Sequence, residues 1–415
     1  MITRIEAYRY RCFERLGVDL SPFQILVGCN GAGKSTLVDI PVLLGEMLQK
    51  QDIHQAFFRP TPSHERPRAD GGMDLVFNRA GGWFALAIEA ELPQPIAAKA
   101  QAHFIRYELA LAVEDSGLEL TQESILLYHT RPATESLPEG LWSQSHLNTN
   151  SGVRTIMTRE RAGNTSLQRE PVWQGPKPAS VEFASQAGSP SLAFVPPDND
   201  RYPACNWLRQ HLRDRCLAYV PNISRLRSAQ PSPGKDFSLA FDGSTLPWSV
   251  LRLASDRPRF EEWIMHVQSA LPLVSSIDAY QREDDKFAYV KVHYSSGLSV
   301  PAQGLSDGTL SILALSILPF LDNLPSVLVV EEPENGIHPK AIETVLESLS
   351  VMSDTQVFVT SHSPIVVAVT PPDKLLCLHQ TQQNGVEVVR GSQHPRLREW
   401  QGTPSLDTLF NAGVL

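Results

Sequence analysis

The sequence lacks any apolar run long enough to cross a membrane, which takes about 18 residues or more. It also lacks an apolar signal core, because residues 1–20 alternate charged with hydrophobic side chains. Cysteine is scarce: the chain has five, and no pair has CxxC spacing, so neither a disulfide framework nor a zinc site is indicated. We therefore expect a cytoplasmic protein in a reducing compartment, without a membrane partner.

The sequence has no excess of basic residues and no heptads long enough for a coiled coil. Its net charge of −9 argues against a protein that coats nucleic acid, although a local basic groove is compatible with it. A hydrophobic content of 42% suffices for a real core. Because 415 residues is long for one compact domain, we expect two lobes or one domain with a large insertion.

Hydrophobic periodicity predicts an α/β protein. Period-two alternation predicts an antiparallel β layer in the N-terminal third, apart from a helix over 34–50. Residues 133–200 are rich in Ser, Asn, Gly, Pro and Gln and indicate a loop-rich insertion, either a docking surface or a mobile loop. The last third alternates helix with apolar strand, as a mostly parallel sheet does. The predicted strands are 2–9, 16–27, 73–78, 83–92, 104–115, 123–130, 286–295, 326–332, 355–362 and 374–380, and the predicted helices after 200 are 205–220, 257–274, 311–321 and 339–352.

A phosphate-binding loop is predicted at "GCNGAGKS", which matches G-x-x-x-x-G-K-[ST] between an apolar strand and a helix. Its backbone N–H groups and the helix N-terminus would hold a triphosphate. The alternative is a glycine-rich turn that carries a lysine by chance, which the full match and its context disfavour. In this interpretation Asn30, Gly31, Ala32 and Gly33 form the cradle, Lys34 reaches the β- and γ-phosphates, Ser35 ligates Mg²⁺ and Thr36 holds the α-phosphate.

Two carboxylates follow the apolar run in "SVLVVEEPENGIHP", at the carboxyl end of a predicted strand, where ligands of open α/β sheets bind. Such a pair beneath phosphates requires a cation, which Mg²⁺ supplies. We expect Glu331 to hold the metal, through water, and Glu332 to act as the base that polarises the attacking water. The alternative is a solvated acidic turn after a core strand.

A third strand, in "VFVTSHSP", ends in Ser361 and His362. A histidine at this place can hydrogen-bond a γ-phosphate and respond to its loss. A histidine at a strand end is more often structural when it stands alone, but its order after the loop and the carboxylates favours the functional interpretation.

The turn "GLSDGT" at 304–309 runs into an apolar helix. It predicts a second anion-binding helix N-terminus, formed by Gly308 and a helix that begins near Thr309, with the Ser306 hydroxyl. Since the first loop already serves the nucleotide of its own subunit, the second cradle is expected to serve the nucleotide of a partner. This predicts an ATP-sandwich dimer. A plain helix cap by Asp307 is the alternative.

These four motifs, in this order, resemble the ABC-type ATPase heads of the RecF/SMC-like group. They are similar in particular to the AAA_21 ATPases of OLD-type nucleases and bacterial anti-phage systems, over 1–130 and 200–415. The resemblance implies a P-loop NTPase with a mostly parallel sheet, an antiparallel β layer and a helical or loop-rich insertion. It also implies a signature at 305–309, a D-loop near Asn335–Pro339 and a switch histidine at His362.

Two departures from the transporter pattern favour the RecF/OLD side of this group. The signature reads LSDGT where transporters have LSGGQ, and the carboxylate pair is Glu-Glu in place of Asp-Glu. The Q-loop glutamine stays open among Gln51, Gln55 and Gln122. We expect three parts: 1–132 and 286–415 as the two halves of the ATPase head, and 133–285 as an insertion or helical lobe.

The resemblance implies an ATP- and Mg²⁺-dependent hydrolase that dimerises and controls an effector, a nuclease or toxin, in anti-phage defence. Too little chain follows His362 for a TOPRIM nuclease, so the effector is expected on a separate chain. One alternative is a RecF-like clamp that binds DNA, and a weaker one is the nucleotide-binding subunit of a transporter. The DNA alternative rests on basic clusters that include Arg4, Arg9, Arg11, Arg209, Arg213 and Arg215.

Overall fold

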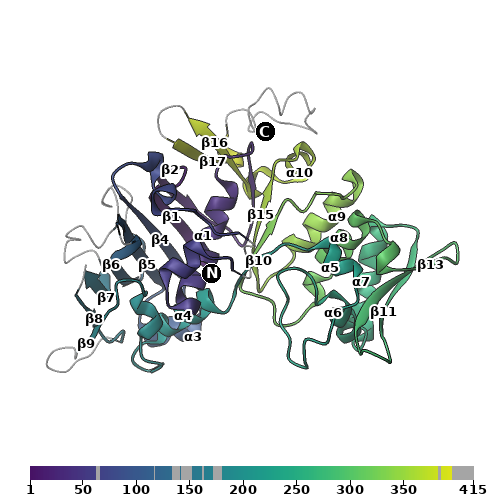
Figure 1. The fold of residues 1–415 in the computed structure, drawn as a ribbon, viewed down its shortest axis with the longest axis horizontal. Coiled ribbons are helices and arrows are strands. Elements are labelled where there is room, and N and C mark those ends of the chain that lie inside the picture. Colours follow the sequence, from purple (N-terminus) through teal and green to yellow (C-terminus); the bar gives the residue numbers. More distant parts are fainter. Residues whose placement is uncertain are drawn as a thin grey trace. The chain divides into compact units, whose positions relative to one another are not determined.

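The structure, a computed structural model, describes residues 1–61, 66–115, 117–132, 141, 152–160, 163–171, 180–381 and 385–394. The chain divides into two compact units, coloured along the sequence in Figure 1. The first comprises Met1–Ser21, Gly31–Cys216 and His379–Val388; the second comprises Pro22–Asn30, Leu217–Leu378 and Val389–Leu415. The boundaries of these two units differ from those of the three predicted parts, 1–132, 133–285 and 286–415. The division into three parts stays a prediction.

The first unit is built on an antiparallel sheet, as the sequence predicted. Its strands follow the order β17-β2-β1-β4-β5-β6-β7-β8-β9. Along β5 the side chains alternate between two faces, with Tyr107 and Leu109 on one and Arg106 and Glu108 on the other. The strands are β1 (Ile2–Tyr10), β2 (Phe13–Asp19), β4 (Trp83–Glu91), β5 (Phe104–Glu114), β6 (Gly117–Tyr128), β7 (Val153–Glu160), β8 (Asn164–Leu167), β9 (Val181–Ala184) and β17 (Gly385–Arg390).

Two strand predictions were wrong in this part of the chain. The segment 73–78 forms the 3-10 helices η1 (Gly72–Leu75) and η2 (Phe77–Arg79), because the Asp74 side chain accepts from the Gly71 N–H at 3.1 Å and closes a turn. The segment 16–27 is two strands, separated at Pro22, a residue that cannot donate to a ladder.

Helix α1 (Lys34–Lys50) has the predicted bounds and is buried along most of its length. At Gly45 a Cβ would lie 2.3 Å from the Leu212 carbonyl oxygen, so the backbones of α1 and α4 (Pro203–Arg213) cross in close contact. The helix predicted over 205–220 ends at Arg213 and is followed by strand β10 (Cys216–Tyr219). Two short helices, α2 (Ile53–Phe58) and α3 (Gln94–Ala100), complete the helices described in this unit.

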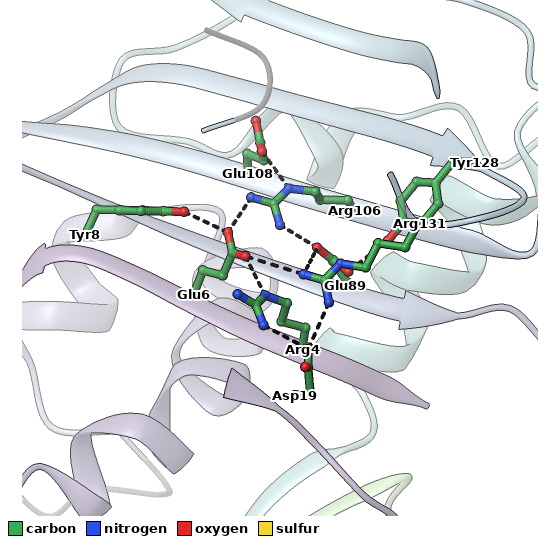
Figure 2. Close-up of polar contacts among 9 residues, drawn as sticks. All are labelled: Arg4, Glu6, Tyr8, Asp19, Glu89, Arg106, Glu108, Tyr128 and Arg131. Atoms are coloured by element: carbon green, nitrogen blue, oxygen red, sulfur yellow. Dashed lines mark hydrogen bonds and ion pairs between the residues drawn. The ribbon is translucent and has the colours of Figure 1, made fainter. Parts of the chain in front are cut away.

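One face of the antiparallel sheet carries a buried ion network centred on Arg106 (Figure 2). Its guanidinium contacts the carboxylates of Glu6, Glu89 and Glu108 at 2.6, 2.7 and 2.6 Å. Burial alone would raise the pKa of Glu6, but Arg106 and then Arg4 outweigh it and hold that pKa at about 2. The network is completed by Tyr8, Asp19, Tyr128 and Arg131.

The second unit contains a parallel sheet, again as predicted, in the order β10-β14-β15-β3-β16. Strands β14, β15, β3 and β16 pair in parallel, and apolar residues such as Leu328, Val359 and Ile25 are buried in its core with Val345 of α9. The elements are β3 (Phe23–Val27), β14 (Val327–Glu331), α9 (Pro339–Ser350), β15 (Gln356–Ser361), α10 (Pro364–Val369) and β16 (Leu375–Thr381).

A second core of this unit packs helices against a small antiparallel sheet, β11-β12-β13. Trp263 is fully buried there and its Nε1 donates to Ser316 Oγ at 3.1 Å, which joins α7 to α8. In the described part of the chain, no helix is long and apolar enough to span a bilayer. The elements are α5 (Ile223–Arg227), α6 (Leu246–Leu253), α7 (Arg257–Ala270), β11 (Val274–Gln281), β12 (Ala288–Tyr294), β13 (Ser299–Pro301) and α8 (Asp307–Ser316).

Candidate active site

Three parallel strands of the second unit end at one edge of the sheet and bring the predicted motifs there. Val27, the last residue of β3, is paired with Ser361, and Glu331 is paired with Thr360. The phosphate-binding loop therefore starts beside Ser361, and the carboxylates start on the other side of the same strand, β15. This is the edge at which open α/β sheets bind their ligands.

The predicted phosphate-binding loop has the backbone that its glycines allow. Gly31 and Gly33 have φ values of 82° and 88°, in the left-handed region that favours glycine. At Gly33 a Cβ would also lie 2.7 Å from Cys12 Sγ and 3.0 Å from the Phe13 ring. Gly33 is the N-cap of α1 and itself supplies no side-chain hydrogen bond to the helix.

The predicted ligands differ in their exposure along this loop. Lys34 is buried to 6% exposure at the first position of α1, whereas Ser35 and Asn30 are exposed and Thr36 is half-buried. Ala32 is buried, which places it in the packing of the loop. The boundary between the two units falls between Asn30 and Gly31.

Glu332 has a strained backbone, with φ at 45° in the left-handed region, which for a non-glycine residue costs about 1–3 kcal/mol. Two main-chain hydrogen bonds hold it there: its N–H donates to the Thr360 carbonyl at 2.9 Å, and its own carbonyl accepts from Asn335 N at 3.0 Å. The turn thus directs the Glu332 side chain differently from that of Glu331, the last residue of β14.

The Glu332 carboxylate is oriented by two neighbours. His362 Nδ1 lies 3.0 Å from Glu332 Oε1, and Asn335 Nδ2 donates to Glu332 Oε2 at 2.9 Å. The side chains of Glu332 and His362 are 33% and 43% exposed, so both are open to solvent. The sequence placed both residues at this edge but gave no sign that they pair directly, nor that Asn335 contacts the carboxylate.

A second hydrogen bond joins the two strand ends. Ser361 Oγ donates to Glu334 Oε1 at 2.5 Å and accepts from Ser363 N at 3.0 Å. Ser361 is therefore part of the scaffold that connects β15 to the turn after β14. Glu334 is a contact residue that motif analysis did not single out.

The predicted metal ligands are of the kinds that hold Mg²⁺ together with a nucleotide. The described residues contain no cluster of three or more His, Cys, Asp or Glu side chains that would cage a metal alone. Mg²⁺ is ordinarily held by one or two protein groups together with waters and substrate phosphates. Glu331 supplies one carboxylate in the second unit, and Ser35, the other predicted ligand, belongs to the first unit.

The predicted signature turn runs into helix α8 as the sequence indicated, and the helix begins at Asp307, slightly before the predicted start near Thr309. Ser306, not Asp307, is the N-cap: its Oγ accepts from Thr309 N at 3.2 Å. This cap accounts for the local structure of the turn without a ligand. Gly308 packs against the D-loop segment, because a Cβ there would lie 2.3 Å from the Gly336 carbonyl oxygen.

The glutamine of a Q-loop stays unassigned. Gln51 is the left-handed C-cap of α1, Gln55 bonds Asp52 on α2, and Gln122 lies on β6. None of these positions distinguishes one candidate from the others.

Most of the basic clusters are bound to the protein itself. Arg209 donates to the Val195 carbonyl at 2.5 Å and to Asn206 Oδ1 at 2.7 Å, and Arg213 pairs with both oxygens of Asp214. Three arginines near the N-terminus also contact groups of the protein itself. Arg4 contacts the carboxylates of Glu6 and Asp19. Arg9 donates to the Ala80 carbonyl, and Arg11 donates to the Arg68 carbonyl.

Comparisons with known proteins agree with this fold. Residues 172–368 match the family described as "AAA domain, putative AbiEii toxin, Type IV TA system". This range includes the signature turn, Glu332 and His362 but begins after the phosphate-binding loop. No curated protein matches the chain.

Solved SMC heads are similar over most of the chain. One is the Smc head domain with an extended coiled coil bound to the C-terminal domain of ScpA, derived from Pyrococcus furiosus, at 11% identity and TM-score 0.51, over 94% of this chain and 95% of that one. Another is the SMC head domain from Thermotoga maritima, at 12% identity and TM-score 0.42, over 94% and 98%. At 11% identity and a TM-score of 0.51, the likeness to the P. furiosus head shows the fold alone, which is that of an SMC-head P-loop NTPase.

The fold is similar to that of SMC-head P-loop NTPases, and residues 172–368 match the AAA domain model. The predicted α/β fold, with its parallel and antiparallel sheets, is confirmed. The roles of single residues remain predictions.

Proposed function

We propose that this protein is an ATPase switch that binds ATP and Mg²⁺, closes as an ATP-sandwich dimer and hydrolyses ATP to ADP and phosphate. In the proposal Lys34, Ser35 and the loop 30–36 hold the nucleotide. Glu331 binds the metal, which supplies charge neutralisation, and Glu332 takes the proton of the attacking water. Ser306 and Gly308 complete the site of a partner subunit.

The observation that carries this proposal is the shared edge of β3, β14 and β15. It places the start of the phosphate-binding loop, the carboxylate pair and His362 at the ends of adjacent parallel strands. The strain at Glu332 supports a functional role for that turn, since strained non-glycine residues gather at active sites.

In this proposal the ATPase controls a separate effector protein, a nuclease or toxin, in cytoplasmic anti-phage defence. The family that matches residues 172–368 is described by a toxin–antitoxin system, and the SMC head from P. furiosus was solved with a domain of ScpA bound. A protein partner for this chain is the corresponding proposal. Residues 133–200 are the proposed docking insertion, of which the structure describes only 141, 152–160, 163–171 and 180–200.

The second candidate function is a RecF-like clamp on DNA. It is the weaker one because the arginines that motivated it, such as Arg209 and Arg213, are bound to the protein's own carbonyl and carboxylate groups. The structure gives no argument for a transporter subunit beyond the shared ABC-type motifs.

Binding of a separate effector is tested by affinity purification of tagged Glu332→Gln from its native host in ATP, followed by mass spectrometry. Lys34→Ala, expected not to bind nucleotide, is the matched control. A nuclease or toxin-like protein enriched with Glu332→Gln over Lys34→Ala supports the effector proposal. Recovery of DNA with no protein beyond the chain itself contradicts it and favours the clamp.

A further inference from the structure

The predicted signature turn carries a carboxylate at the place where it would meet a phosphate. Asp307 is the first residue of α8, directly after the N-cap Ser306, and its side chain is 60% exposed. In the isolated subunit the partial positive charge of the helix N-terminus favours this carboxylate. A triphosphate that approached the same N-terminus would be repelled by it.

A single arginine from a distant element binds this carboxylate. Arg227, the last residue of α5, places Nη2 at 2.5 Å from Asp307 Oδ1 and 3.0 Å from the Leu305 carbonyl oxygen. The two partners are 80 residues apart in the sequence. In the described part of the chain, no other cation forms an ion pair with Asp307.

The double contact fixes both the charge and the position of the acid. Because one amino group bridges Leu305 and Asp307, the carboxylate is held toward the segment before the helix. The Ser306 hydroxyl is bound within the first turn, to Thr309, and takes no part in holding Asp307. Arg227 is therefore the residue that neutralises the Asp307 carboxylate.

We propose that Arg227 is a positioning residue of the dimer site: it neutralises Asp307 and holds it away from the phosphates of the nucleotide on the partner subunit. The inference rests on the proposed ATP-sandwich dimer and names the residue that makes an acidic signature turn compatible with it. Arg227 acts through Asp307, not by its own contact with phosphate.

The test uses the full chain with the Glu332→Gln substitution as the parent protein, so that ATP hydrolysis does not dissociate the dimer. The dimer dissociation constant in ATP and Mg²⁺ is measured by sedimentation velocity for Arg227→Ala, Asp307→Asn and the double variant. Arg225→Ala is the matched control: it lies on the same helix, is 65% exposed and faces Asp242 only at 3.9 Å. ADP affinity, measured by calorimetry, reports whether each variant is folded.

Arg227→Ala is expected to weaken the dimer at least about tenfold, because an unpaired carboxylate then faces phosphate. The double variant, which has neither charge, is expected to dimerise within about threefold of the parent. Arg225→Ala and Asp307→Asn should dimerise as the parent does, and ADP affinity should not change in any variant.

Two results would overturn the inference. One is an Arg227→Ala dimer as tight as the parent. The other is a double variant as weak as Arg227→Ala, which would mean that the guanidinium acts on phosphate or on the Leu305 carbonyl. Both are distinct from failure of the proposed function, in which the parent itself stays monomeric in ATP and both proposals fall together.

Discussion

His362 Nδ1 lies 3.0 Å from Glu332 Oε1, and this contact joins the ends of two neighbouring parallel strands. Asn335 holds the other oxygen of the same carboxylate at 2.9 Å. A base that is fixed by two partners loses little freedom when it takes a proton, and a histidine beside it can respond to its charge.

Replacement of Glu332 by Gln removes the proposed base and keeps the shape of the side chain. We expect the ATPase rate to fall about 10²–10⁴-fold, the usual contribution of a positioned general base, with nucleotide affinity retained. His362→Ala should lower the rate less, because it removes a group that orients the base. Phosphate release and nucleotide titration measure the two quantities.

His129→Ala is the control for these variants, since His129 is an exposed histidine after β6 and lies outside the predicted motifs. A normal turnover rate for Glu332→Gln would show that the base is another group.

Gly308→Ala is expected to disturb the contact between the signature turn and the D-loop. The new Cβ would lie 2.3 Å from the Gly336 carbonyl, a backbone atom that cannot move aside as a side chain does. We expect ADP binding by the monomer to persist and the ATPase rate to fall at least about tenfold, since the turn at Glu332 and the predicted signature would both shift. An ATPase rate equal to that of the unmodified protein would refute the coupling of these two segments.

Arg106→Leu is expected to destabilise the first unit by about 3–5 kcal/mol. The substitution leaves Glu6, Glu89 and Glu108 buried without their shared cation, and a buried ion that loses its partner is costly. The free energy of unfolding in urea measures the effect. Arg79→Leu, which removes an exposed ion pair to Asp74, should change it by less than about 1 kcal/mol.

Acid should unfold the protein partly through Glu6. Its folded pKa of about 2 lies below the ordinary value of 4.5, so its ionised form stabilises the fold above pH 4.5. This contribution is lost as the pH falls from about 5 toward 2, because the unfolded state then binds the proton more tightly. Glu6→Gln should therefore flatten the dependence of the urea midpoint on pH in this window. An unchanged slope would assign acid unfolding to other groups.

Where apolar periodicity and boundary residues agree, the sequence was sufficient to predict the fold. Helix α1 begins directly after Gly33 and has the predicted bounds, and β14 and β15 are buried runs that end in polar residues. The predicted strand over 73–78 failed because the Asp74 side chain forms a local turn that competes with extended backbone.

The placement of the candidate site could be predicted, but its contacts could not. Parallel strands put the start of the loop, the carboxylates and His362 at one edge of the second unit, which motif order alone implies. The His362–Glu332 pair spans 30 residues and the Arg227–Asp307 pair spans 80, and no local pattern encodes a contact over such separations. The alternative of a plain helix cap agrees with the structure except for the capping residue, which is Ser306 and not Asp307.

The nucleotide-sandwich switch is tested most directly by the mass of Glu332→Gln, measured by sedimentation velocity in ATP with Mg²⁺ and in ADP. Lys34→Ala and Ser306→Arg are measured in the same background. We predict that Glu332→Gln is a dimer in ATP with Mg²⁺ and a monomer in ADP. Lys34→Ala should lose both nucleotide binding and the dimer, and Ser306→Arg should be a nucleotide-bound monomer. A Glu332→Gln that binds ATP and stays monomeric, or a Ser306→Arg that dimerises normally, would contradict the nucleotide-sandwich switch.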